Sequence, residues 1–123
     1  MGNSMGKHPL PQKENLYETD CPILYAMQII GQKWKLPILW YIAAAENKNL
    51  RYKELERKVV GITATMLTKC LRELEKDQLI TRVQHNTIPP TVEYSLSQRG
   101  KSLLPALESL YAWAEHEMAA KEN

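Results

Sequence analysis

The chain has 123 residues, of which 44% are hydrophobic and 24% charged, and its formal net charge is +2. This length suits one globular domain, because a second hydrophobic core would not fit. The two cysteines, Cys21 and Cys70, are too few and too far apart for a disulfide framework or a zinc site.

Neither a membrane span nor a secretion signal is visible. No apolar run approaches the roughly 18 residues that a bilayer-spanning helix needs, and residues 1–18 lack a signal-peptide pattern. We therefore expect a cytoplasmic protein with reduced thiols and no membrane partner. Nothing in the sequence predicts a metal or another cofactor.

Charge is distributed unevenly along the chain. Between Lys33 and Lys101 there are 13 Lys/Arg against 7 Asp/Glu, a net charge of +6, whereas the preceding and following segments carry −1 and −3. A basic middle between mildly acidic ends suits a surface that faces a polyanion.

The N-terminal part is predicted to be a flexible arm followed by a short helix. Residues 1–19 lack hydrophobic periodicity, so we expect an arm there and a single folded domain over 20–123. Asp20 is suited to cap a helix whose first residue is Pro22 and whose end is Gly31.

A second helix is predicted from about residue 33 to residue 46, with Pro37 in its first turn, where the missing N–H costs little. A very short strand could follow at Leu50. The helix face expected to turn inward consists of Trp34, Ile38, Tyr41, Ile42 and Ala45.

Two helices separated by a tight turn come next. The first is expected over 51–59 and the second over 63–77, with Gly61 in the turn and Thr63 as the N-cap of the second helix. The apolar face of that second helix consists of Met66, Leu67, Cys70, Leu71 and Leu74.

The last third of the chain is predicted to form a hairpin and a long helix. Alternating apolar and polar residues predict strands at 80–84 and 92–96, joined by a tip at 85–90. Ser97 can cap a helix that runs to about residue 120. Its apolar stripe consists of Leu103, Leu104, Leu107, Leu110, Tyr111, Ala114 and Met118.

The order of four helices, a hairpin and a final helix predicts a mainly α (α+β) fold. It is a winged helix-turn-helix with a two-stranded wing and a long C-terminal dimerisation helix.

The helix predicted over 63–77 has an outward face suited to double-stranded DNA. Small and hydroxyl-bearing side chains near its N-terminus allow a close approach to a groove. Lys69 and Arg72 add charge, and the fork of Arg72 suits guanine or a phosphate. The preceding turn and the following hairpin favour DNA contact over a merely solvated face. This face consists of Thr63, Ala64, Thr65, Thr68, Lys69 and Arg72.

The wing supplies further candidate contacts. Arg82 and His85 could straddle a phosphate backbone, although for His85 ordinary strand-edge polarity is an equal alternative. Arg51, at the start of the preceding helix, is a candidate phosphate contact.

The first and last helices offer more apolar surface than one small domain needs, which predicts a homodimer. Two recognition helices about one DNA turn apart would convert weak half-site contacts into one specific complex. The expected interface residues are Ile23, Met27, Leu107, Leu110, Tyr111 and Ala114.

Other classes of function fit less well. The three histidines are scattered and no paired acids share a face with a nucleophile, so we do not expect an enzyme. The alternative is a winged-helix module for protein–protein interaction without DNA binding. It predicts no salt-dependent affinity for any duplex, whereas DNA binding weakens steeply with salt.

Several short motifs follow one another in a specific order. They are Cys21-Pro22-Ile23; Ile30-Gly31-Gln32-Lys33-Trp34-Lys35 with Ile38-Leu39; Arg51-Tyr52-Lys53-Glu54-Leu55; Gly61-Ile62-Thr63; Met66-Leu67-Thr68; Leu71-Arg72-Glu73-Leu74; and Pro89-Pro90-Thr91-Val92-Glu93-Tyr94-Ser95-Leu96 with Gly100. In this order, over about residues 21–113, the chain resembles the HxlR-type transcriptional regulators, relatives of the MarR winged helices.

The resemblance implies a homodimeric bacterial repressor or activator that responds to a chemical signal, either a small molecule or an oxidant. It also implies that Arg82 and the hairpin tip contact the DNA backbone. At Ala64 many relatives carry a longer polar residue, which puts one base contact in doubt. The positions that match the family's recognition helix are Thr63, Thr65, Thr68, Lys69 and Arg72.

Cys21 matches the position of a cysteine that senses electrophiles or oxidants in several members of the family. A helix dipole would stabilise its thiolate, but members that do not sense also keep it, so a side chain with no signalling role is an equal alternative. Cys70 is expected to pack in the core, where burial raises the pKa of its thiol. Trp34 could line an effector pocket, but core packing is the better interpretation.

Overall fold

The computed structural model describes residues 18–121, so the predicted N-terminal arm lies outside the described residues except for its last two. The chain forms two compact units with their boundary between Lys33 and Trp34. Each unit is described below by itself, and the single domain expected over 20–123 stays a prediction. Within the described part, no helix has the length and hydropathy to cross a membrane.

In the described residues of the first unit there is one α-helix, α1 (Pro22–Ile30). The expectation that Asp20 caps it is wrong: Cys21 is the N-cap, with an extended backbone, and makes no side-chain capping hydrogen bond. The reason is that Pro22 fixes the first helical position, and the residue before a proline prefers an extended conformation. At the other end Gly31 donates its N–H to the carbonyl of Met27 at 3.0 Å.

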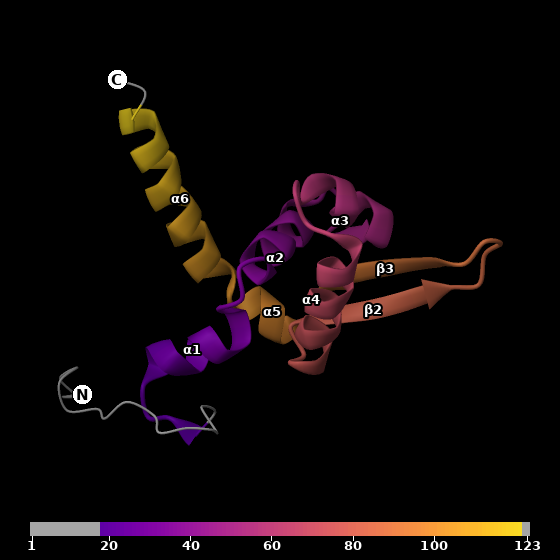
Figure 1. Ribbon diagram of the computed structural model, residues 1–123, viewed down its shortest axis with the longest axis horizontal. Coiled ribbons are helices and arrows are strands. Elements are labelled where there is room, and N and C mark those ends of the chain that lie inside the picture. Colours follow the sequence, from indigo (N-terminus) through magenta and orange to yellow (C-terminus); the bar gives the residue numbers. More distant parts are fainter. Residues whose placement is uncertain (1–17, 122–123) are drawn as a thin grey trace. The chain divides into compact units, whose positions relative to one another are not determined.

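The second unit holds the remaining helices and a sheet (Figure 1). Its first half places helices on either side of a short strand, and its second half is a hairpin followed by two helices. In chain order the elements are α2 (Lys35–Ala44), β1 (Asn49–Arg51), α3 (Tyr52–Lys58), α4 (Ala64–Lys76), β2 (Ile80–His85), β3 (Thr91–Leu96), α5 (Gln98–Ser102) and α6 (Leu104–Lys121).

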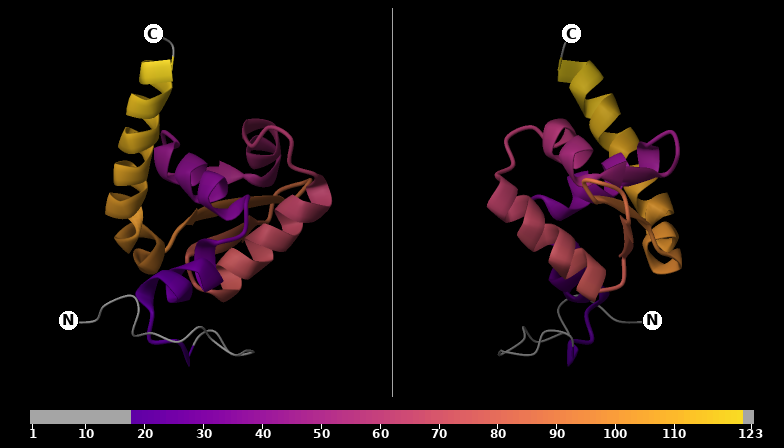
Figure 2. Two further views of the ribbon diagram at one scale, coloured as in Figure 1. Left: turned by 60° about the vertical axis from the view of Figure 1, so that its left-hand side comes forward. Right: turned by 90° about the vertical axis from the view of Figure 1, so that its right-hand side faces the viewer.

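The sheet is antiparallel with the order β1–β3–β2. The predicted hairpin is confirmed, with each strand one residue longer than expected, because His85 still pairs with Thr91. The short strand expected at Leu50 pairs with Tyr94 of β3 and gives the sheet its third strand. In Figure 2 the sheet lies against helices, with α2 contacting β3 and α4 contacting β2.

The core of this unit lies between the helices and one face of the sheet. In α2 the predicted inward face is partly wrong, because Tyr41 is exposed and Leu39 is buried. This helix is apolar on most of its circumference, so hydrophobic periodicity could not identify the buried face. The fully buried large side chains are Ile38, Leu39, Ile42, Leu55, Leu67, Leu71, Leu74, Ile80 and Cys70.

The single C-terminal helix expected from Ser97 to residue 120 is wrong in one respect. Ser97 does cap a helix, accepting a hydrogen bond from the N–H of Gly100 at 3.0 Å, but this helix is the five-residue α5, and α6 begins only at Leu104. Pro105 explains the break, since proline is tolerated in a helix's first turn and disrupts a helix interior. The long C-terminal helix itself is confirmed.

Candidate nucleic-acid interface

The helix-turn-helix is formed by α3, a turn and α4. Gly61 has a φ of 95°, a left-handed conformation that favours glycine, so the chain reverses tightly there. Thr63 then caps α4 as predicted, its hydroxyl accepting the N–H of Met66 at 3.1 Å. These local signals fix where α4 begins.

The two faces of α4 have opposite character. Leu67, Cys70, Leu71 and Leu74 are buried in the core, as predicted. On the other face Thr63, Ala64, Thr65, Lys69 and Arg72 are exposed, and Thr68 is half-buried. A shallow surface groove runs along this outward side. It is lined by Ala64, Thr65, Thr68, Lys69, Arg72 and Glu73.

Tyr52 of α3 ties the two helices of the motif together. Its hydroxyl lies 3.0 Å from Oγ1 of Thr68 and donates to the backbone carbonyl of Ala64 at 3.1 Å. In the sequence Tyr52 stood out only as part of the motif Arg51-Tyr52-Lys53-Glu54-Leu55, which gave no sign of this role. The contact fixes the side chain of Thr68, so its methyl group remains for an outside partner while its hydroxyl is already hydrogen-bonded.

A second contact that holds α4 comes from α2, and no sequence pattern indicates it. Nζ of the buried Lys35 lies 2.9 Å from Oε1 of Glu73. The hydrogen bond from Lys35 lowers the pKa of the Glu73 carboxyl, and burial opposes that shift. Glu73 borders the outward groove, so Lys35 neutralises a carboxylate that would otherwise repel a phosphate.

Cys70 behaves as predicted from the apolar face of α4. It is buried, and desolvation raises the pKa of its thiol. Cys21 differs: its side chain is half-exposed at the N-cap of α1. Trp34, for which core packing was preferred over an effector pocket, is half-buried beside Gly61.

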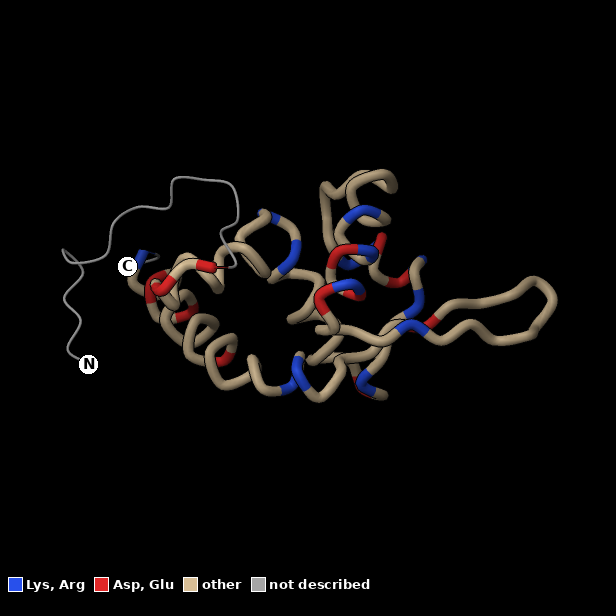
Figure 3. Tube along the Cα trace, turned by 90° about the horizontal axis from the view of Figure 1, so that it is seen from below, with Lys and Arg blue, Asp and Glu red and all other residues tan. Residues whose placement is uncertain are grey.

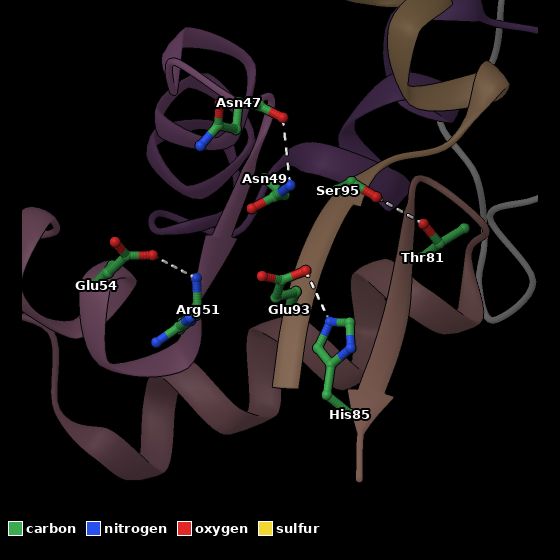
Figure 4. Close-up of polar contacts among 8 residues, drawn as sticks. All are labelled: Asn47, Asn49, Arg51, Glu54, Thr81, His85, Glu93 and Ser95. Atoms are coloured by element: carbon green, nitrogen blue, oxygen red, sulfur yellow. Dashed lines mark hydrogen bonds and ion pairs between the residues drawn. The ribbon is translucent and has the colours of Figure 1, made fainter. Parts of the chain in front are cut away.

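The wing divides into a polar base and an uncharged tip. Nε2 of His85 lies 2.9 Å from Oε1 of Glu93 (Figure 4), so this predicted DNA contact already has a carboxylate partner. Arg82 is exposed on β2, and Arg51 is exposed where β1 leads into α3. Residues 86–92 contain no Lys, Arg, Asp or Glu, as the tan hairpin tip in Figure 3 shows.

The residues expected at a dimer interface differ in exposure. Leu110 and Tyr111 are exposed on α6, and Ile23 and Met27 are exposed on α1. Ala114 is half-buried. Leu107 is buried within the protomer, which leaves little of it for a partner.

Comparisons with known proteins agree with this architecture. The family model described as HxlR-like helix-turn-helix matches residues 29–122. A helix-turn-helix-type transcriptional regulator of Halalkalibacterium halodurans is 43% identical over 94 residues, covering 76% of this chain and 81% of that protein.

Two solved structures share the fold. A MarR-family transcriptional regulator of Porphyromonas gingivalis W83 superimposes with a TM-score of 0.72 at 35% identity, covering 78% of this chain and 91% of that one. The redox regulator HypR in its reduced form gives a TM-score of 0.74 at 33% identity, covering 83% and 98%. The chain thus belongs to the HxlR-like helix-turn-helix family of transcriptional regulators.

Proposed function

We propose that the chain binds double-stranded DNA sequence-specifically as a homodimer, with α4 in the major groove and the hairpin along the phosphate backbone. The observation that carries the proposal is the outward face of α4, which is exposed, groove-shaped and cationic. Its opposite face is buried, so the helix is held rigidly while this side remains open.

Each part of the face has its own task in this proposal. Ala64 and Thr65 at the N-terminus of α4 are short enough for a close approach, and their methyl groups can touch thymine. Lys69 supplies a point charge, and Arg72 supplies a bidentate fork for guanine or phosphate.

The phosphate backbone is assigned to the arginines outside α4. Arg51 and Arg82 are both exposed, and phosphate contacts fix a protein's register on the duplex without reading sequence. His85 is left out of this set, because it is bound to Glu93.

Dimerisation is proposed from the exposed apolar surface of α6 and of α1. Tyr111 stacks on Trp40 of α2 with ring centroids 4.6 Å apart, which anchors α6 to the protomer while Leu110 and Trp113 remain exposed. An exposed apolar helix face of this kind marks a protein–protein interface. Two-fold symmetry would then bring two copies of α4 to successive major grooves.

Selection from a pool of random duplexes tests the DNA proposal. The enriched sites should contain two inverted half-sites whose centres lie about 10–10.5 base pairs, or a multiple of this, apart. Fluorescence anisotropy should show affinity falling with salt, at a logarithmic slope of about 0.9 per phosphate neutralised. No enrichment together with no salt-dependent binding would instead support the protein–protein module.

A second proposal concerns response to oxidants through Cys21. Its thiol is half-exposed at the N-terminus of α1, where an oxidant in solution can reach it. HypR, solved in reduced and oxidised forms, is called a redox regulator. In this proposal the Cys21 thiolate attacks hydrogen peroxide and takes one oxygen, which gives a sulfenic acid and releases hydroxide.

The test compares DNA affinity before and after peroxide treatment. The wild type should change affinity and recover with dithiothreitol, whereas Cys21→Ser should not respond. Cys70→Ala is the matched control, because the buried thiol should have no part in the response. An unchanged peroxide response in Cys21→Ser would remove Cys21 from the mechanism.

A further inference from the structure

A pocket of about 510 Å³ lies apart from the α4 groove, among α2, the sheet and the start of α6. It shares no residue with the groove and none with the first unit of the chain. Its volume is within the range of about 300–1,000 Å³ that is usual for small-molecule sites.

The charged groups that line this pocket are all positive. Lys48 and Lys101 are its two cations, and none of its described lining residues is acidic. Nζ of Lys48 donates to the carbonyl of Ala43 at 3.3 Å, at the C-terminal end of α2. This holds the ammonium in place, and an ammonium has three N–H groups, so it can also donate to an anion.

The lining of the pocket combines polar and aliphatic residues. Asn49, Ser95 and Thr81 stand in register across the three strands, with Oγ of Ser95 2.9 Å from Oγ1 of Thr81 (Figure 4). Ala43, Leu96 and Leu104 provide apolar surface without an aromatic ring. A ligand that complements this lining and the two cations has an anionic head and a short aliphatic body.

We propose that this pocket is an effector site for a small aliphatic carboxylate. The carboxylate lies between Lys48 and Lys101 and accepts a hydrogen bond from the amide of Asn49. The aliphatic chain packs on Leu96 and Leu104. This arrangement uses the two cations for the charge and the apolar lining residues for the chain, so neither a neutral nor a cationic analogue satisfies it.

The position of the pocket connects it to the proposed DNA contacts. Asn49 is on the same short strand as Arg51, and Ser95 is on β3, one of the two strands of the wing. A bound ligand would bridge these strands to α5 and α6 and restrain them together. This coupling rests on the proposed DNA binding, whereas ligand binding itself does not.

Binding is tested with hexanoate as the probe, by ¹H–¹⁵N spectra of the full chain without DNA. Saturable shifts should centre on the amides of Asn49, Ser95 and Leu96, with a Kd on the order of 1 mM, ordinary for so small a ligand. The double substitution Lys48→Gln with Lys101→Gln should weaken binding about tenfold, the expected loss of two charge-assisted contacts. Lys53→Gln with Lys58→Gln, the same charge change on α3, should leave it unchanged.

Analogues of hexanoate separate the proposed site from a general cation patch. Hexan-1-ol and hexylamine should bind at least about fivefold more weakly, because they lack the anionic head. Inorganic phosphate should also bind weakly, because it lacks the chain. Equal binding of phosphate, equal binding of the alcohol, or no effect of the Lys48/Lys101 substitutions would overturn the proposal.

Coupling is tested separately by anisotropy on a selected duplex. Saturating hexanoate should change the DNA affinity of the wild type at least threefold and leave the Lys48/Lys101 variant unaffected. Hexanoate shifts at the pocket with no change in DNA affinity would refute an effector role. If no duplex is bound at all, the DNA proposal fails while the spectra still decide whether the pocket binds carboxylates.

Discussion

The two long helices of the second unit, α4 and α6, differ in how far their apolar side chains are buried. In α4 the apolar face is completely buried within the protomer. Its side chains are each at most 2% exposed: Leu67, Cys70, Leu71 and Leu74. In α6 only Leu107 is buried, while Leu110 and Tyr111 are 48% and 49% exposed and Trp113 and Met118 are each 64% exposed.

The difference indicates which kind of partner each helix lacks. On α4 the side left open is polar and cationic, which suits a polyanion. On α6 the side left open is apolar, which suits another protein surface, and in our proposal that surface is a second copy of the chain. Substitutions on the two helices should therefore separate folding, dimerisation and DNA binding.

The largest expected effect is on folding, at the buried face of α4. Leu74→Ala should lower the free energy of unfolding by about 2–5 kcal/mol, because it leaves a cavity in the core. Urea denaturation at a fixed protein concentration measures this loss. Leu110→Ala is the matched control on α6 and should cost much less per protomer. Equal losses would show that the α6 face is already buried.

Next in size is an effect on assembly. Leu110→Asp places a charge in the exposed apolar face of α6 and should weaken the dimer about hundredfold, or about 2.7 kcal/mol. Size-exclusion chromatography with light scattering would show a monomer at concentrations where the wild type is a dimer. Ser109→Asp adds the same charge at the neighbouring exposed position and should leave the dimer largely intact. A dimer that survives Leu110→Asp would exclude this face.

The third expected effect is on DNA affinity, through substitution of a side chain on the outward face of α4. Arg72→Ala should lower it by about 1–3 kcal/mol without changing the dimer, because Arg72 is exposed and borders the groove. A loss that is equal for all duplexes would assign Arg72 to phosphate, and a loss confined to the selected site would assign it to a base. Lys58→Ala, on α3, is the control. Unchanged affinity in Arg72→Ala would contradict the assigned face.

The features predicted correctly from sequence are those with local causes. α4 was placed accurately because Thr63 caps it and its apolar positions repeat at helical spacing. The buried face of α2 could not be identified, because apolar residues cover most of the circumference of that helix. The break before α6 has a local cause in Pro105 that the apolar stripe obscured. The ties that hold α4, from Tyr52 and from Lys35, join residues far apart in sequence, so no local pattern could reveal them.

The smallest expected effect concerns the tie between Lys35 and Glu73. Glu73→Gln removes the charge that pairs with Lys35, whose ammonium is buried, while the amide oxygen can still accept a hydrogen bond. The side chain of Glu73 is 40% exposed, so solvent screening limits the expected loss of stability at neutral pH to about 1 kcal/mol.

The pH dependence of the free energy of unfolding tests the ion pair between Lys35 and Glu73, because the folded-state pKa of Glu73 is lowered. A carboxyl with a depressed folded pKa stabilises the protein above its unfolded pKa, near 4.5, and loses that contribution as the pH falls through the folded pKa. The wild type should therefore lose its advantage over Glu73→Gln as the pH falls below about 4.5. Glu75→Gln, at an exposed position on the same helix, should show no such convergence. A difference between wild type and Glu73→Gln that stays constant as the pH falls would show that the side chain acts through packing. The ion pair would then not be what holds α4 to α2.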